Sequence, residues 1–216
     1  MLSKRFLISL AAAASAWLCG PAHAALTPFT SQASFAAAVA APSTDTFAFV
    51  PLDFVASPST RSTGPYGYVV SAPSGLFGGG SAGNPWLSTN LSGAAMTFSS
   101  FTGGVAGIGG SFFASDLTGG VLAGQSLTLT ATDSLGATLT QTLANPGQSS
   151  FLGFASSGSL VSLVVSIANR DAFVAVDNLV LAAPIAAAVP EPETYALLLA
   201  GLAVLGGLAR RRRKPA

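Results

Sequence analysis

The sequence predicts an all-β fold, a single jelly-roll-like β-sandwich placed between an N-terminal signal helix and a C-terminal transmembrane helix. Segments rich in Thr, Ser, Val and Phe recur between residues 44 and 181, and glycine or proline separates them at short intervals. Several of these segments alternate polar and apolar residues, as half-buried strands do. No amphipathic pattern long enough for the crossover helix of a parallel sheet accompanies them. Together these observations favour a sandwich of short strands.

Residues 1–24 have the features of a secretory signal peptide. A cationic start precedes an apolar run over residues 6–18, and Ala22 and Ala24 supply the small residues that a signal peptidase requires. We place the cleavage after Ala24. The run is too short for a comfortable membrane span. A lipoprotein site at Cys19 is the alternative, and it is disfavoured because the two residues before that cysteine are bulky.

The predicted folded domain, residues 25–186, has few charges. Between residues 25 and 189 the cations are Arg61 and Arg170, and the acids are six aspartates, so two positive and six negative charges give a net charge of −4. Nucleic-acid binding requires clusters of Lys and Arg, so the sequence predicts no nucleic-acid partner.

The domain also lacks three residue types that carry much of enzyme chemistry. The cysteine and the histidine of the chain, Cys19 and His23, lie in the predicted signal peptide, and no lysine lies between residues 25 and 189. A Ser-His-Asp triad, a cysteine nucleophile, a His/Cys zinc site and a Schiff-base lysine are therefore excluded from the domain. Disulfides are excluded as well, so stability must come from a hydrophobic core.

The elements of the first half are expected as follows. Residues 31–39 (SQASFAAAV) predict a short helix capped by Thr30 or Ser31, and an alanine-rich loop is the alternative. Residues 44–49, 68–71 and 96–98 are weaker strand candidates. The glycine-rich residues 75–83 (GLFGGGSAG) predict a flexible surface loop, because they lack the lysine and the flanking strand and helix of a phosphate-binding loop.

The second half contains the clearer strands. Residues 126–131 (SLTLTA) and 137–143 (ATLTQTL) both alternate, and the turn-like sequence Asp-Ser-Leu-Gly at 133–136 joins them, which predicts a β-hairpin. Strands with one face in the core are also predicted over residues 109–113, 160–167 and 173–181.

The C-terminal segment, residues 187–216, combines three features in a fixed order. Pro190, Glu191 and Pro192 come first, and a 15-residue apolar run over 195–209 follows. As a helix this run is about 22 Å long, somewhat short of the roughly 30 Å hydrocarbon core of a bilayer. A stop-transfer cluster follows the run: Arg210, Arg211, Arg212, Arg213 and Lys214. Such a cluster stays in the cytoplasm, so the folded domain is predicted to lie outside the inner membrane.

This order of motif, apolar helix and arginine cluster, together with a signal peptide, resembles that of PEP-CTERM proteins. The resemblance implies an exported protein of a Gram-negative bacterium whose tail is a transient inner-membrane anchor. It implies processing by exosortase, an integral-membrane enzyme, after export by the secretion machinery and signal peptidase. It further implies a place at the cell surface or in a biofilm matrix of exopolysaccharide. A permanent single-pass anchor is the alternative. The stretches 153–154 and 176–179 also look like β-sandwich ectodomains of this family.

Residues of the domain suggest two further activities. Asp116 and Asp133 are candidates for a carbohydrate-active enzyme, although aspartates in such positions usually shape turns. A second hypothesis is a calcium-dependent carbohydrate-binding module. Its candidate calcium ligands are Asp171, Asp177 and Asn178, which offer oxygen atoms. Its candidate sugar-stacking residues are Tyr66, Tyr68 and Trp86, for which packing on the edge of the sandwich is the alternative.

We therefore expect a non-enzymatic protein with no catalytic residues and no firm cofactor or metal, in a structural or adhesive role that involves extracellular polysaccharide.

Overall fold

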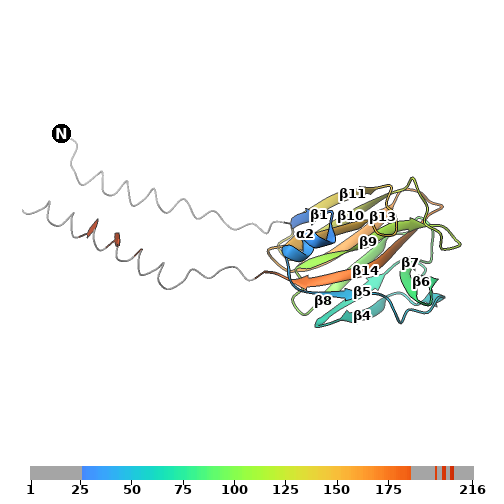
Figure 1. Cartoon of the computed structure of the whole chain (residues 1–216), viewed down its shortest axis with the longest axis horizontal. Coiled ribbons are helices and arrows are strands. Elements are labelled where there is room, and N and C mark those ends of the chain that lie inside the picture. The colour runs from blue at the N-terminus through green and yellow to red at the C-terminus, as the bar shows by residue number, and fades with distance from the viewer. Residues whose placement is uncertain (1–25, 186–197, 199–200, 203–204, 207–216) are drawn as a thin grey trace, which may run out of the picture. The chain divides into compact units, whose positions relative to one another are not determined.

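The computed structural model describes residues 26–185, 198, 201–202 and 205–206 of the chain (Figure 1). The chain divides into two units, Met1–Pro184 and Ile185–Ala216, and the fold described here is that of the first. The predicted signal helix and most of the predicted transmembrane helix lie outside the described residues. No helix within the described part of the chain is long and apolar enough to cross a membrane.

Fourteen strands form two antiparallel sheets, which confirms the predicted all-β sandwich. The larger sheet has the order β1-β12-β9-β14-β7-β6-β3, and β2 also pairs with β14. Its strands are β1 (Leu26–Phe29), β2 (Ala40–Asp45), β3 (Phe54–Val55), β6 (Leu76–Ser81), β7 (Asn84–Thr89), β9 (Gly107–Ser115), β12 (Phe151–Ser156) and β14 (Phe173–Ala183).

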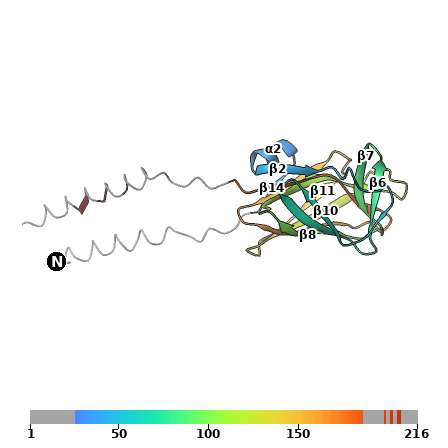
Figure 2. The ribbon, with the colours of Figure 1, turned by 90° about the horizontal axis from the view of Figure 1, so that it is seen from below.

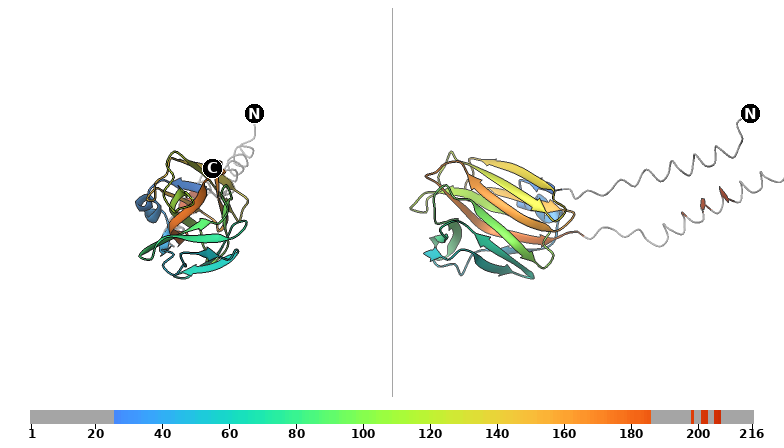
Figure 3. Two further views of the ribbon diagram at one scale, coloured as in Figure 1. Left: turned by 90° about the vertical axis from the view of Figure 1, so that its right-hand side faces the viewer. Right: turned by 180° about the vertical axis from the view of Figure 1, so that it is seen from behind.

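The smaller sheet has the order β11-β10-β13-β8-β5-β4. Its strands are β4 (Ser59–Thr63), β5 (Tyr66–Ser71), β8 (Met96–Thr102), β10 (Ser126–Asp133), β11 (Thr138–Ala144) and β13 (Leu160–Ile167). The predicted hairpin is β10 and β11, in which Thr128 lies opposite Thr142 and Thr132 opposite Thr138. Figure 3 shows the strands of the sandwich from one end and from behind.

One hydrophobic core fills the space between the sheets. The smaller sheet contributes side chains such as Phe98, Leu129 and Leu163, and the larger sheet contributes side chains such as Ile108 and Phe112, all fully buried. Strand β10 alternates buried and partly exposed positions, as its sequence predicts. This core replaces the disulfides that the domain cannot form.

The outer face of the larger sheet is covered by two smaller clusters, which is why β9 and β14 are buried on both faces. The predicted helix is α2 (Gln32–Ala37), and Ser31 caps it, because its Oγ accepts a hydrogen bond from Ser34 N at 3.2 Å. Phe35 of α2 packs with Val180 and Ala182 of β14. Figure 2 shows α2 beside β2 and β14.

The second outer cluster consists of Trp86, Phe113 and Ala175. The rings of Trp86 and Phe113 meet edge to face, with centroids 5.4 Å apart. Val174, Val176, Leu179 and Leu181 of β14 face the core between the sheets, so Ala175 of this cluster points to the same outer face as the residues under α2.

Two predictions need correction. Residues 44–49 do not form one strand, because β2 ends at Asp45 and Phe47 has a φ of 56°, a left-handed conformation that ends an extended segment. Residues 75–83 are not a flexible loop, because they contain the paired strand β6. Glycine occurs in this strand because neighbouring groups approach its backbone closely: a Cβ on Gly78 would overlap the carbonyl of Pro51.

Candidate functional site

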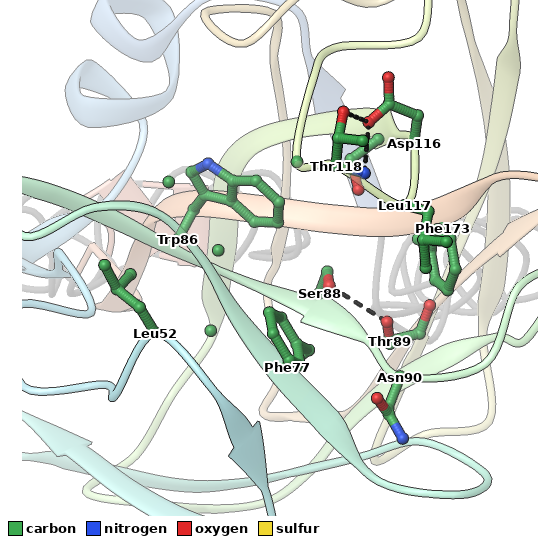
Figure 4. Close-up of a pocket in the computed structure, with 15 residues that line it drawn as sticks. Leu52, Phe77, Trp86, Ser88, Thr89, Asn90, Asp116, Leu117, Thr118 and Phe173 are labelled. Atoms are coloured by element: carbon green, nitrogen blue, oxygen red, sulfur yellow. Dashed lines mark hydrogen bonds between the residues drawn. The ribbon is translucent and has the colours of Figure 1, made fainter.

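A pocket of about 370 Å³ opens on the outer face of the larger sheet, beside the cluster of Trp86 (Figure 4). Four segments line it: residue 52 in the loop before β3, strands β6 and β7 with Asn90, the end of β9 with the loop at 116–119, and the first residue of β14. It is the candidate site of the folded domain. The volume is near the lower end of the range for small-molecule sites, roughly 300–1,000 Å³.

Strand register explains the floor of this pocket. Ser88 of β7 lies opposite both Phe77 of β6 and Ala175 of β14, and Phe173 of β14 lies opposite Ser115 of β9. Because side chains alternate along a strand, these residues point to the same face as Trp86. The floor therefore combines aromatic and hydroxyl side chains from four strands, with Ser88 beside Phe77 and Ser115 beside Phe173.

Glycines of β6 allow the indole ring to lie against the sheet. A Cβ on Gly79 would overlap the ring of Trp86, and a Cβ on Gly80 would lie 2.8 Å from its Nε1. Trp86 is 3% exposed as a result. The glycine-rich strand thus packs directly against Trp86, the only tryptophan in the described part of the chain.

A tight loop after β9 forms one wall. Asp116 Oδ1 accepts hydrogen bonds from Thr118 N at 2.8 Å, from Thr118 Oγ1 at 2.7 Å and from Gly120 N at 2.9 Å. The bonds from Thr118 and Gly120 lower the pKa of the Asp116 carboxyl below its ordinary value. The carboxylate therefore carries a negative charge at neutral pH, and Oδ2 accepts none of these three bonds.

Polar groups from the end of β7 lie at the opposite wall. Ser88 Oγ donates to Thr89 O at 3.1 Å, and Asn90 Nδ2 donates to Ser74 O at 3.0 Å. Asn90 is exposed, and the bond uses only its amide nitrogen. Thr89 Oγ1 is buried and has no hydrogen-bond partner among the described residues. Thr89 shares the core-facing side of Leu87, since side chains alternate along β7.

A second polar cluster joins the two sheets away from the pocket. Arg61 of β4 binds Asp45 of β2 in a bidentate ion pair, with Nε–Oδ2 and Nη2–Oδ1 distances of 2.8 Å. Tyr68 OH donates to Asp45 Oδ2 at 2.7 Å, and the Arg61 guanidinium lies 5.0 Å from the ring centroid of Phe47. Burial raises the pKa of the Asp45 carboxyl, but the bonds from Arg61 and Tyr68 outweigh burial and lower the pKa overall.

The two aspartates suggested for catalysis have local structural roles. Asp116 holds its loop and lines the pocket. Asp133 is 2% exposed, and its Oδ1 accepts hydrogen bonds from Leu135 N and Ala137 N in the turn between β10 and β11. Ser156 Oγ donates to its Oδ2 at 3.0 Å. Asp116 is the single carboxylate that lines the pocket.

Two of the three suggested calcium ligands are neighbours at one bulge, and the third lies in a separate turn. Asp177 and Asn178 adjoin a bulge of β14: Asp177 is buried, Asn178 is exposed, and Asn178 N donates to Asp177 Oδ1 at 2.7 Å. Asp171 precedes the strand, in a turn where its N–H donates to Asn169 Oδ1. From Phe173 to Asp177 the strand rises about 13 Å, so the turn that contains Asp171 and the bulge beside Asp177 lie at different points along β14. No group of three or more His, Cys, Asp or Glu able to hold a metal occurs within the described residues.

The suggestion that tyrosines stack on a sugar is wrong. Tyr66 and Tyr68 are 2% and 1% exposed because alternation in β5 directs both side chains into the core. Trp86 is the one residue of the suggested set that lines the pocket. Phe77, Ser88, Asn90 and Phe173 also line the pocket and were not predicted from the sequence. Reading residues 75–83 as a strand would have placed Phe77 and Gly79 on one face.

The suggested processing residues lie outside the described part of the chain. They are Ala22 and Ala24, the motif Pro190, Glu191 and Pro192, and the cluster Arg210, Arg211, Arg212, Arg213 and Lys214. Signal peptidase cleavage and the membrane span therefore remain predictions.

Comparison with known proteins bears on this C-terminal segment. The family model for the PEP-CTERM protein-sorting motif matches residues 188–214. No curated protein matches the chain. Among solved structures, the chain is similar to TmCBM61, determined in complex with β-1,4-galactotriose, with 10% identity and a TM-score of 0.30 over 53% of this chain and 86% of that one. A similarity of that size carries no argument about the domain.

The match over residues 188–214 confirms the resemblance deduced from the tail. The chain carries a PEP-CTERM protein-sorting motif behind a β-sandwich domain; the motif supports export and sorting to the cell surface and implies exosortase as the processing partner.

Proposed function

We propose that this PEP-CTERM protein is a non-enzymatic structural or adhesive component of an extracellular polysaccharide matrix, such as a biofilm, around a Gram-negative cell. The sorting motif at residues 188–214 is the observation that carries the proposal, because it delivers the folded domain to the cell surface. The signal peptide and the transient membrane anchor belong to the same proposal.

The chemistry of the domain agrees with a role that does not involve catalysis. Asp116 and Asp133 shape turns and Asp45 pairs with Arg61, and the sequence of the domain has no histidine, cysteine or lysine to act as base or nucleophile. A carbohydrate-active enzyme of the usual kind needs two carboxyls about 5–10 Å apart beside the substrate, and the pocket is lined by Asp116 alone among the acids.

Intact-mass analysis of the protein recovered from the native culture tests the sorting proposal. We expect the loss of residues 1–24 and of the residues that follow Pro190–Pro192. A mature protein that still contains residues 195–216 would indicate a permanent anchor instead. Any mass added to the new C-terminus would identify the group to which exosortase attaches it.

The pocket beside Trp86 favours a second candidate, a carbohydrate-binding module. The calcium-dependent form of this hypothesis predicts that calcium raises the melting temperature of the protein. An Asp177→Asn variant should then lose that shift, and equal shifts in variant and parent would exclude Asp177 as a calcium ligand.

A further inference from the structure

We infer that the pocket between β6, β7 and the loop at 116–119 binds a neutral saccharide of one or two sugar units, and not an acidic sugar or an apolar molecule. The inference rests on the proposed function only in placing the domain among extracellular polysaccharides. Its other grounds are the shape, the side chains and the charge of the pocket.

The first ground is the pairing of aromatic faces with hydroxyl groups. Phe77 is 38% exposed, and Phe173 and Trp86 line the same cavity. A sugar ring has apolar C–H faces that pack on aromatic rings and a periphery of hydroxyls that need hydrogen bonds. The floor offers both, since Ser88 lies opposite Phe77 and Ser115 lies opposite Phe173 in the strand register.

The second ground is the set of polar groups at the walls. Asn90 uses its amide nitrogen to bind Ser74 O, which leaves its carbonyl oxygen to accept a bond from a ligand hydroxyl. Ser88 Oγ donates to Thr89 O and keeps its lone pairs for a ligand donor. An apolar ligand would bury these groups without partners, at a cost in affinity.

The third ground is charge. Asp116 is ionised at the wall, and neither Arg61 nor Arg170 lines the pocket. A carboxylated, sulfated or phosphorylated sugar would therefore meet a like charge with no cation to compensate it. The volume of about 370 Å³ suits a ligand of one or two rings and excludes a long chain from lying wholly inside.

Fluorescence tests the inference directly, because the chain has two tryptophans and the other one, Trp17, lies in the predicted signal peptide. The full chain with Trp17→Phe would be titrated in a zwitterionic detergent, since glycoside detergents carry sugar headgroups. The probes are cellobiose, maltose and lactose as neutral sugars, galacturonic acid as an acidic sugar, and hexan-1-ol as an apolar molecule. We expect at least one neutral disaccharide to shift the emission of Trp86 with saturation.

Two variants and one control locate the effect. Phe77→Ala should weaken the binding of that disaccharide about five- to tenfold, because it removes the exposed aromatic face. Asn90→Ala should also weaken it, and this exposed residue gives a second test should Phe77→Ala fail to fold. Phe49→Ala is the matched control, because Phe49 is 98% exposed and lies outside the pocket. The Phe49→Ala protein should bind the disaccharide with the affinity of the parent.

Three results would overturn the inference. They are no response to any of the neutral disaccharides, equal or tighter binding of galacturonic acid or hexan-1-ol, and equal affinities of the parent, Phe77→Ala and Asn90→Ala proteins. The mass analysis of the mature protein is independent of these titrations, so the pocket inference and the sorting proposal can fail separately.

Discussion

At the scale of single residues, the ion pair of Arg61 with Asp45 has the largest effect that the structure predicts. Asp45 is 7% exposed and Arg61 is 19% exposed. Their pairing places a charge-assisted bidentate contact between β2 of one sheet and β4 of the other. Removal of one partner leaves the other charge buried and unpaired. The resulting loss of unfolding free energy exceeds the net stabilisation that the pair provides.

We therefore expect Arg61→Met to lower the free energy of unfolding by about 3 kcal/mol. Methionine keeps the apolar stem, so the loss reports mainly the unpaired Asp45 carboxylate. Urea denaturation followed by circular dichroism measures the change. Arg170→Met removes an exposed cation and serves as the control, with an expected change within about 0.5 kcal/mol. Equal losses in the two variants would contradict a structural role for the pair.

The same pair makes the free energy of unfolding depend on pH. The pKa of Asp45 is lower in the folded state than its ordinary value of 3.8. Its contribution is therefore complete above pH 3.8 and is lost as the pH falls through the folded pKa. Asp177 acts in the opposite sense, because burial raises its pKa. We expect unfolding titrations below pH 3.8 to show a steeper loss of stability in the parent than in Arg61→Met.

At the scale of elements, β6 shows why a composition rule failed. Glycines usually indicate a loop, and the sequence 75–83 contains six consecutive residues, 78–83, without a large side chain. The strand nevertheless forms because two neighbouring groups fill the space that its side chains would occupy. The carbonyl of Pro51 does so at Gly78, and the ring of Trp86 does so at Gly79. Both groups lie outside residues 75–83, so local composition contains no sign of them.

Gly79→Ala tests this account of β6. The added methyl would overlap the Trp86 ring, so we expect a loss of about 1–3 kcal/mol in unfolding free energy, as for other overpacked sites. A red shift in the emission of Trp86 should accompany the loss, as the indole moves toward solvent. Gly83→Ala is the matched control, because nothing lies within 4 Å of its added Cβ. A stable Gly79→Ala protein with unchanged emission would contradict the close packing of this strand.

The strands predicted best are those whose pattern is local. The hairpin of β10 and β11 was predicted within two residues, because Thr alternates with Leu and a Gly-containing turn separates the two halves. In contrast, β2 ends earlier than predicted, since Asp45 turns its side chain to Phe47 N and Arg61, a partner 16 residues away. The pocket floor could not be predicted, because it depends on the register of four strands.

At the scale of the whole molecule, the sequence separates into a delivery tail and a folded domain. The tail was identified from a fixed order of residue types, and the family match confirmed it. For the domain, the sequence predicted only the fold class, since the alternation of polar and apolar residues in sandwich strands is common to many sequences. Its candidate site emerged only when β6, β7, β9 and β14 were brought together.

Truncation after Ile185 tests this separation. The described core ends within β14 at Ala183, so we expect the truncated protein to keep the melting temperature of the parent. It should fail to be sorted to the cell surface, because the motif at 188–214 is gone. Differential scanning calorimetry and cell fractionation measure the two effects. A large fall in melting temperature would show that the tail contributes to folding.

The central place of β14 has a mechanical consequence. This last strand is hydrogen-bonded on one side to β9 and on the other to β7 and β2. A pull on the chain beyond Ala183 that is directed along β14 would load both ladders in shear, so that they would rupture nearly together. A strand at a sheet edge peeled from its end would break one bond at a time. The tail thus continues from a strand that is held by ladders on both sides.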